Sequence, residues 1–172
     1  MSPLVAGESC LEDEVVGLFE QFRERLLRYL MALGLSVHDG EEVVQEVFLS
    51  LFQHLRRAKP RHNLRAWIFR VAHNLGLRHR KRMRRQLRQA AEIGRPRADS
   101  GPNPEEQVLR GERQERLQAV LHALPEQDRW CLYLRAEGLR YREIAETLNI
   151  SLGAVSLSLG RSLARLARVD GR

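Results

Sequence analysis

The chain has 172 residues, of which 43% are apolar and 30% charged, so it can bury a core and is not a disordered polypeptide. Its 29 basic and 22 acidic residues leave a formal net charge of +7, which suits a polyanionic partner. Two cysteines argue against a disulfide scaffold and fit a reducing compartment. No apolar run approaches the roughly 20 residues of a membrane-spanning helix. Because Met1 to Leu11 also lacks the features of a signal peptide, we expect a cytoplasmic protein.

Two amphipathic helices are predicted at the start of the chain. Apolar residues recur three or four positions apart over 12–33, as on one face of a helix, and Gly34 ends the pattern. A broad apolar stripe over 43–55 predicts the next helix. Asp39 is its expected N-cap, with Glu42 three residues later as the capping-box partner.

A third predicted helix changes character along its length. Asn63 is its expected N-cap, and apolar residues over 64–77 mark a buried face. From Arg78 to Arg88 basic residues follow one another with almost no acidic compensation, so we expect these turns to leave the core. Three prolines and two glycines over 93–104 then predict a linker.

A second helical set follows, with helices predicted over 108–124, 126–136 and 141–148. Asn149 is expected to turn the backbone, and Ser151 to cap a last helix. Three apolar residues form the expected buried side of that helix: Val155, Leu159 and Leu163. This spacing is that of a helix-turn-helix, whose second helix enters the DNA major groove. An ordinary corner of two packed helices has the same spacing, so DNA binding and plain packing both stay open on spacing alone.

Three segments together resemble the extracytoplasmic-function (ECF) RNA polymerase sigma factors of the sigma-70 family. Residues 39–48, DGEEVVQEVF, are similar to the acidic helix with which these factors hold the polymerase clamp. Residues 63–75, NLRAWIFRVAHNL, with the basic run behind them, resemble the helix that captures and melts the promoter −10 element. Residues 124–127, LPEQ, and 138–145, GLRYREIA, resemble the region that reads the −35 element. The resemblance covers nearly the whole chain.

The resemblance implies an all-α fold of two small helical domains joined by a flexible linker. A region 2-like domain is expected over 1–88, the linker over 89–104, and a region 4-like helix-turn-helix domain over 105–172. The implied function is that of a sigma factor, which binds bacterial core RNA polymerase and directs promoter recognition and DNA opening. Promoter DNA is thus the second implied partner, and an anti-sigma factor that covers these surfaces is a third. We expect no membrane partner.

Candidate site residues follow from this match and from side-chain chemistry. Five residues on the acidic helix are expected to bind core polymerase: Asp39, Glu41, Glu42, Gln45 and Glu46. Eight residues are expected to contact DNA at the −10 element, the amide of Asn74 through a base and the histidine and cations through phosphates. They are Arg65, Arg70, His73, Asn74, Arg78, Lys81, Arg82 and Arg85. The recognition helix offers five candidates for the −35 element: Ser151, Ser156, Leu157, Ser158 and Arg161.

The chain departs from the family pattern at two places. Arg78 stands where members commonly carry an aspartate, which weakens any transfer of base contacts. The recognition helix has no cation before Arg161, whereas the family usually places lysine and arginine near its start. Bidentate readout of guanine is therefore missing there, and Gly160 should weaken the helix. We expect weak or unusual −35 binding.

Two other classes of protein are less well supported by the sequence than a sigma factor. A helix-turn-helix regulator that acts without polymerase is the alternative, and the acidic second helix next to a basic third helix argues against it. An enzyme is not indicated, because no phosphate loop, nucleophile elbow or paired carboxylates appear. The six histidines are scattered without the paired spacing of a metal site, so neither a metal nor another cofactor is expected.

Overall fold

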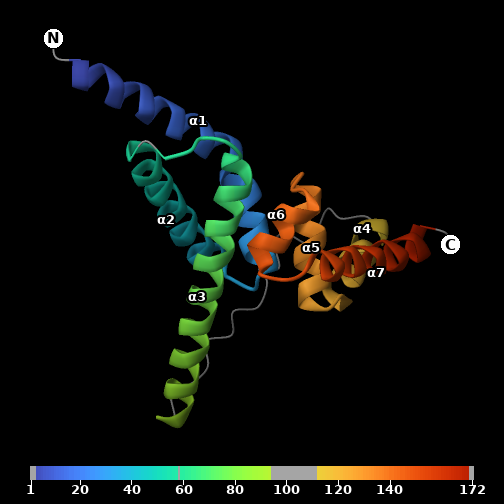
Figure 1. Ribbon diagram of the computed structural model, residues 1–172. Helices are drawn as coiled ribbons and strands as arrows, with labels where there is room; N and C mark the ends of the chain where they lie inside the picture. The colour runs from blue at the N-terminus through green and yellow to red at the C-terminus, as the bar shows by residue number, and fades with distance from the viewer. Residues whose placement is uncertain (1–2, 58, 94–111, 171–172) are drawn as a thin grey trace. The chain divides into compact units, whose positions relative to one another are not determined.

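The regular structure of this protein is helical throughout the residues that the computed structural model describes, 3–57, 59–93 and 112–170 (Figure 1). The described elements are α1 (Pro3–Ala32), α2 (Val37–Arg56), α3 (Leu64–Glu92), α4 (Glu112–Ala123), α5 (Glu126–Ala136), α6 (Tyr141–Leu148) and α7 (Leu152–Asp170). The chain divides into two compact units, Met1–Met83 and Arg84–Arg172. The expected all-α fold in two parts is confirmed. No described helix is long and apolar enough to cross a membrane.

The first unit is held together by apolar faces of α1, α2 and α3. Leu30 of α1, Leu51 of α2 and Phe69 of α3 are all fully buried. Two glycines let α1 approach its neighbours closely. A Cβ atom at Gly40 would lie 2.8 Å from the Leu27 Cδ1 atom, and one at Gly76 would lie 2.8 Å from the Leu30 Cδ2 atom. A larger residue at either position would require the leucine side chain, or the helix that carries it, to shift.

The start of α2 differs from the prediction. Ser36, not Asp39, is the N-cap: its backbone is extended, and its hydroxyl oxygen accepts a hydrogen bond from the Asp39 backbone N–H at 3.1 Å. The serine hydroxyl in turn donates to the Asp39 Oδ2 atom at 2.6 Å. Asp39 therefore lies in the first helical turn, where a carboxylate is favoured by the helix dipole. The sequence holds two overlapping capping patterns, and the earlier one is used.

The two long helices of the first unit extend further than predicted. α1 begins at Pro3 rather than near residue 12, and α3 continues to Glu92. Residues 84–89 of α3 are exposed, as expected for turns rich in arginine. Residues 89–92 of the predicted linker are thus helical, and 94–104 lie outside the described residues.

The second unit contains the predicted helix-turn-helix. The bounds of α5 and α6 agree with those predicted from the sequence. Asn149 has φ 54° and ψ 49°, a left-handed conformation that ends α6. The Ser151 hydroxyl oxygen then accepts a hydrogen bond from the Ala154 backbone N–H at 3.1 Å and caps α7. Both local predictions are confirmed.

The buried side of α7 was predicted correctly at two of three positions. Val155 and Leu159 are buried, whereas Leu163 is 57% exposed. Eight helical residues after Val155, a side chain has turned by roughly 80° from the original direction. Ser162 takes the inward position in its place and is fully buried.

Candidate nucleic-acid interface

A basic stripe runs along the surface of α3. Five predicted contacts recur at intervals of three or four residues and so share one face of the helix: Arg70, Asn74, Arg78, Lys81 and Arg85. Arg70 is half-buried and the other four are exposed. Arg82, also exposed, lies at the edge of this face, whereas Arg65 lies about half a turn away from it. We call these five residues and Arg82 the basic stripe.

The cations of the basic stripe beyond Asn74 have no acidic partner among the described residues. None of Arg78, Lys81, Arg82 and Arg85 forms an ion pair with another described side chain. Four cations on about two turns of helix repel one another unless counterions or a ligand neutralise them. A phosphate backbone would supply that neutralisation.

His73 corrects a prediction, because it is part of the core rather than of the DNA-facing surface. Only 3% of the residue is exposed, and the Nδ1 atom lies 2.8 Å from the Tyr29 hydroxyl oxygen in a buried hydrogen bond. Burial, assisted by the positive charge of Arg80, lowers the pKa of His73 to about 4. The ring is therefore neutral at pH 7 and faces α1. It lies four residues after Phe69 and three before Gly76, both buried, and so shares the inward face of α3.

The predicted polymerase contacts on α2 are partly engaged within the chain. Glu42, Gln45 and Glu46 are exposed, whereas Asp39 and Glu41 are half-buried. The Glu41 Oε1 atom accepts from the Arg23 Nη2 atom at 2.7 Å, so this carboxylate already has a cationic partner.

Sequence analysis missed one residue on the same outward side of α2. Leu49 is 65% exposed, and it follows Gln45 and Glu46 by four and three residues. The only signal was its absence from the apolar stripe of the helix. We call Glu42, Gln45, Glu46 and Leu49 the outer face of α2.

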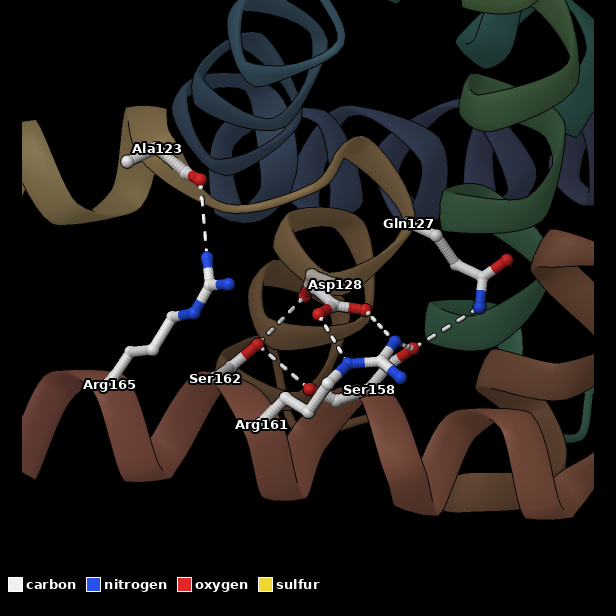
Figure 2. A network of polar contacts seen from close by, with 7 residues as sticks. All are labelled: Ala123, Gln127, Asp128, Ser158, Arg161, Ser162 and Arg165. Atoms are coloured by element: carbon white, nitrogen blue, oxygen red, sulfur yellow. Dashed lines mark hydrogen bonds and ion pairs between the residues drawn. The ribbon is translucent and has the colours of Figure 1, made fainter.

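The predicted contacts on α7 fall into two groups. Ser156 and Leu157 are exposed, and Ser151 is exposed although its hydroxyl caps the helix. Ser158 is fully buried, so its assignment as a DNA contact is corrected. Its hydroxyl oxygen accepts a hydrogen bond from the Gln127 Nε2 atom at 3.2 Å, across the interface with α5 (Figure 2).

Arg161, the first cation of α7, is bound to a buried carboxylate. Its Nε and Nη2 atoms donate to the Asp128 Oδ2 and Oδ1 atoms at 3.0 and 2.6 Å, a bidentate pair shown in Figure 2. Asp128 is 1% exposed, and this pairing lowers the pKa of its carboxyl. Arg161 therefore fixes α7 against α5, and base readout would require this pair to break.

Further hydrogen bonds extend this network along α7. The Ser162 hydroxyl donates to the Ser158 carbonyl oxygen at 2.9 Å and to the Asp128 carbonyl oxygen at 3.4 Å. The Arg165 Nη1 atom donates to the Ala123 carbonyl oxygen at the end of α4 at 3.3 Å. Figure 2 shows both residues on the side of α7 that faces α5 and the end of α4. The start of α7 thus presents a neutral surface, and its first cations hold the unit together.

Two family descriptions match the two parts of the chain. Sigma-70 region 2 matches residues 18–86, and Sigma-70, region 4 matches residues 114–166. The first covers the helices that carry the outer face of α2 and the basic stripe, and the second covers the helix-turn-helix.

Several sigma factors are similar to this chain over most of its length. CnrH of Cupriavidus metallidurans, an RNA polymerase sigma factor, is 30% identical over 182 residues, with 97% of this chain and 95% of CnrH covered. SigE of Mycolicibacterium smegmatis, an ECF RNA polymerase sigma factor, is 32% identical over 158 residues, with 90% of this chain and 59% of SigE covered. YlaC of Bacillus subtilis, an RNA polymerase sigma factor, is 25% identical over 158 residues and 91% of each chain. This chain thus spans 59% of the length of SigE and nearly the whole length of the other two.

Solved structures share the fold. CnrH in complex with the cytosolic domain of CnrY has a TM-score of 0.61 at 23% identity, covering 96% of this chain and 92% of that chain. The sigma factor RpoE in complex with the anti-sigma factor NepR from Bartonella quintana has a TM-score of 0.61 at 19% identity, covering 89% and 96%. With both regions matched in order, and a relative covered almost end to end, this chain belongs to the sigma-70 family of RNA polymerase sigma factors, in its extracytoplasmic-function group.

Proposed function

We propose that this sigma factor binds core RNA polymerase through the outer face of α2 and opens promoter DNA with the basic stripe of α3. The observation that carries the proposal is the set of four cations on the basic stripe without an acidic partner among the described residues, Arg78, Lys81, Arg82 and Arg85, which follow the exposed amide of Asn74. The polymerase supplies the chemistry, so we expect the chain itself to have no catalytic activity. Promoter DNA and polymerase share the bacterial cytoplasm, and we expect the protein to act there.

Strand opening is the step for which the basic stripe is suited. Holding a base outside the stack costs a few kcal/mol. Phosphate contacts from Arg78, Lys81 and Arg85 offset this cost by releasing counterions. Asn74, one turn before Arg78 on the same face, offers both a donor and an acceptor to the edge of an unpaired base. The amide is thus suited to base recognition, and the cations are suited to binding the DNA phosphate backbone.

The outer face of α2 is suited to a protein partner. Three of its members are acidic or amide side chains that phosphates would not attract, and Leu49 is an exposed apolar side chain beside them. A charged rim around an apolar anchor is typical of protein interfaces. Core polymerase is the partner that family membership favours.

Upstream DNA contact should be weak and should come from α6 as well as α7. The exposed start of α7 offers Ser156 and Leu157 but no free cation, because Arg161 is paired. Arg142 of α6 is exposed and forms no ion pair with a described residue. The first helix of a helix-turn-helix crosses the DNA backbone, so Arg142 is a candidate phosphate contact that sequence analysis missed.

An anti-sigma factor is a further proposed partner. The sigma factor RpoE was solved with the anti-sigma factor NepR bound, and CnrH was solved with the cytosolic domain of CnrY bound. The outer face of α2 and the exposed leucines of α7 are surfaces that a protein of this kind could cover.

Two surface variants separate the two proposed activities. Asn74→Ala should reduce permanganate-detected strand opening by the reconstituted holoenzyme while leaving its affinity for core unchanged. Glu46→Lys should weaken core binding in a fluorescence titration without changing the affinity of the chain for promoter DNA. Gln86→Ala, an exposed change outside the basic stripe, is the matched control. If Asn74→Ala abolished core binding instead, the two faces would have been assigned in reverse.

The stand-alone regulator remains the second candidate. Such a protein would bind its DNA sites tightly without polymerase. A gel-shift experiment that detects specific binding by the chain alone, together with no measurable affinity for core, would favour it over the proposal.

A further inference from the structure

Three side chains with metal-binding atoms meet between α2 and α3. Asp39 and Glu42 are three residues apart on α2 and so share one face. His79 of α3 faces both: its Nε2 atom lies 3.9 Å from the Asp39 Oδ1 atom and 3.8 Å from the Glu42 Oε2 atom. One ligand atom from each residue lies within 4.8 Å of those of the other two. We call these three residues the α2–α3 cluster.

His79 has no direct hydrogen bond, although its side chain is nine-tenths buried. Only 10% of the side chain is exposed, and the Nδ1 atom is buried without a hydrogen-bond partner in the described structure. The Nε2 atom is also too far from either carboxylate oxygen for a hydrogen bond. A buried polar ring left in this way is costly. Its Nε2 atom is directed at two carboxylates across a gap that a further atom would fill.

The size of that gap suits a metal ion. Zinc binds imidazole nitrogen and carboxylate oxygen at about 2.0–2.2 Å in a tetrahedral arrangement, so two ligand atoms on one zinc ion lie about 3.4 Å apart. The distances from the Nε2 atom to the two oxygens, 3.9 and 3.8 Å, exceed that separation by roughly 0.5 Å. The Glu42 side chain is 56% exposed and is free to move inward, so the three ligands need only small shifts to share one ion.

Neighbouring groups complete the site. The Ser36 hydroxyl donates to the Asp39 Oδ2 atom, which leaves the Oδ1 atom directed toward His79. Hydrogen bonds of this kind orient metal ligands in proteins. His38, exposed, holds its Nε2 atom 3.4 Å from the Glu42 Oε1 atom and offers a fourth ligand. Arg80 follows His79 in the sequence, and its Nη1 atom donates to the Leu33 carbonyl oxygen at 2.9 Å rather than to either carboxylate of the cluster.

We propose that the α2–α3 cluster, with His38, binds one divalent transition-metal ion such as Zn²⁺. Imidazole and carboxylate ligands together favour zinc, cobalt and nickel over calcium or magnesium. The ion would join α2 to α3 and neutralise the two carboxylates that face the histidine. This site differs from the expectation of no metal, because the fold brings together residues forty positions apart in the chain. The inference does not depend on promoter activity.

The experiment is a titration of the chelator-treated, untagged full chain with CoCl₂ and, separately, ZnCl₂. We expect one ion per chain by calorimetry, with visible absorption bands of protein-bound Co²⁺ and a rise in melting temperature, since only the folded state holds the site. Glu42→Gln and His79→Gln should each weaken binding at least about tenfold and remove the rise in melting temperature. Circular dichroism of the metal-free variants checks their fold, and Glu42→Gln, an exposed and isosteric change, keeps the test decisive if His79→Gln unfolds.

Two control variants test whether other ligand-bearing residues contribute. His122→Gln on α4 and Cys10→Ser on α1 change exposed residues outside the cluster and should leave binding unchanged. The proposal is overturned by absence of stoichiometric binding. It is equally overturned by Zn²⁺ affinity that Glu42→Gln leaves unaltered, because the ion would then bind outside this cluster.

Discussion

Acid should destabilise the first unit because His73 is buried in its neutral form. The pKa of His73 is lowered from 6.5 to about 4, first by burial and then by the positive charge of Arg80. Between these two values the unfolded chain binds a proton that the folded chain does not. The contribution of His73 to the free energy of unfolding is therefore fully present above pH 6.5 and is lost as the pH falls toward 4.

The size of this effect follows from the two pKa values. Each unit of pKa difference corresponds to about 1.4 kcal/mol. The loss relative to pH 7.5 should reach about 2 kcal/mol at pH 5 and about 3 kcal/mol at pH 4. The hydrogen bond between Tyr29 and His73 does not set this pH dependence, because a protonated Nδ1 atom can donate to the hydroxyl oxygen just as the hydroxyl can donate to a neutral ring.

The assay is urea unfolding followed by the fluorescence of a single tryptophan. Trp130→Phe leaves Trp67, which lies on α3 in the same unit as His73, as the reporter. In this background His73→Asn, which retains a polar group near the position of Nδ1, should lower stability at pH 7.5. The further loss between pH 7.5 and pH 5 should shrink by about 2 kcal/mol.

Exposed His62 provides the matched control, and His62→Gln should leave the pH dependence as it is in the parent protein. Carboxylates titrate in the same range, so the difference between His73→Asn and the control carries the test. An equal loss of stability with and without His73 would refute the claim that this ring is held neutral.

Three further predictions concern packing and the network of the second unit. Gly160→Ala should raise the free energy of unfolding of the second unit by up to about 1 kcal/mol, because a Cβ atom there meets nothing within 4 Å. Urea unfolding followed by Trp130 fluorescence measures it, and an unchanged or lower midpoint contradicts the prediction. Gly76→Ala should lower the free energy of unfolding of the first unit, reported by Trp67, by about 1–3 kcal/mol, because its Cβ atom would lie 2.8 Å from the Leu30 Cδ2 atom. A neutral result would contradict this and show that the Leu30 side chain or α1 shifts without cost. Asp128→Asn should destabilise the second unit at pH 7 and remove an acid-induced loss: the pKa of Asp128 is lowered, so its contribution is present at neutral pH and disappears as the pH falls through that lowered value. Equal acid sensitivity of this variant and the parent would contradict the role of the pair.

Local signals were sufficient to predict much of the second unit. Pro125 and Gly138 bracket α5, and Asn149 supplies the left-handed residue that ends α6, so these bounds follow from short-range chemistry. The start of α2 shows the limit of such signals. Ser36 and Asp39 each begin a valid capping pattern, and sequence alone does not decide between them.

The predictions that failed depend on partners distant in sequence. His73 can be buried because it shares a hydrogen bond with Tyr29 of another helix. Ser158 can be buried because it shares one with Gln127 of α5. Arg161 resembles a DNA contact until its partner Asp128 is known. Periodicity marks which face of a helix is inward but does not say which polar groups will be satisfied there.

Run-off transcription with purified bacterial core polymerase is the most direct test of the claim that this chain is a working sigma factor. The full chain, mixed with core and a library of promoter fragments, should yield transcripts that start at defined positions, and Asn74→Ala should reduce them. A chain truncated before residue 105 should show how far the neutral α7 contributes to promoter choice. No promoter-dependent transcript, together with no binding to core from several bacterial sources, would contradict the account.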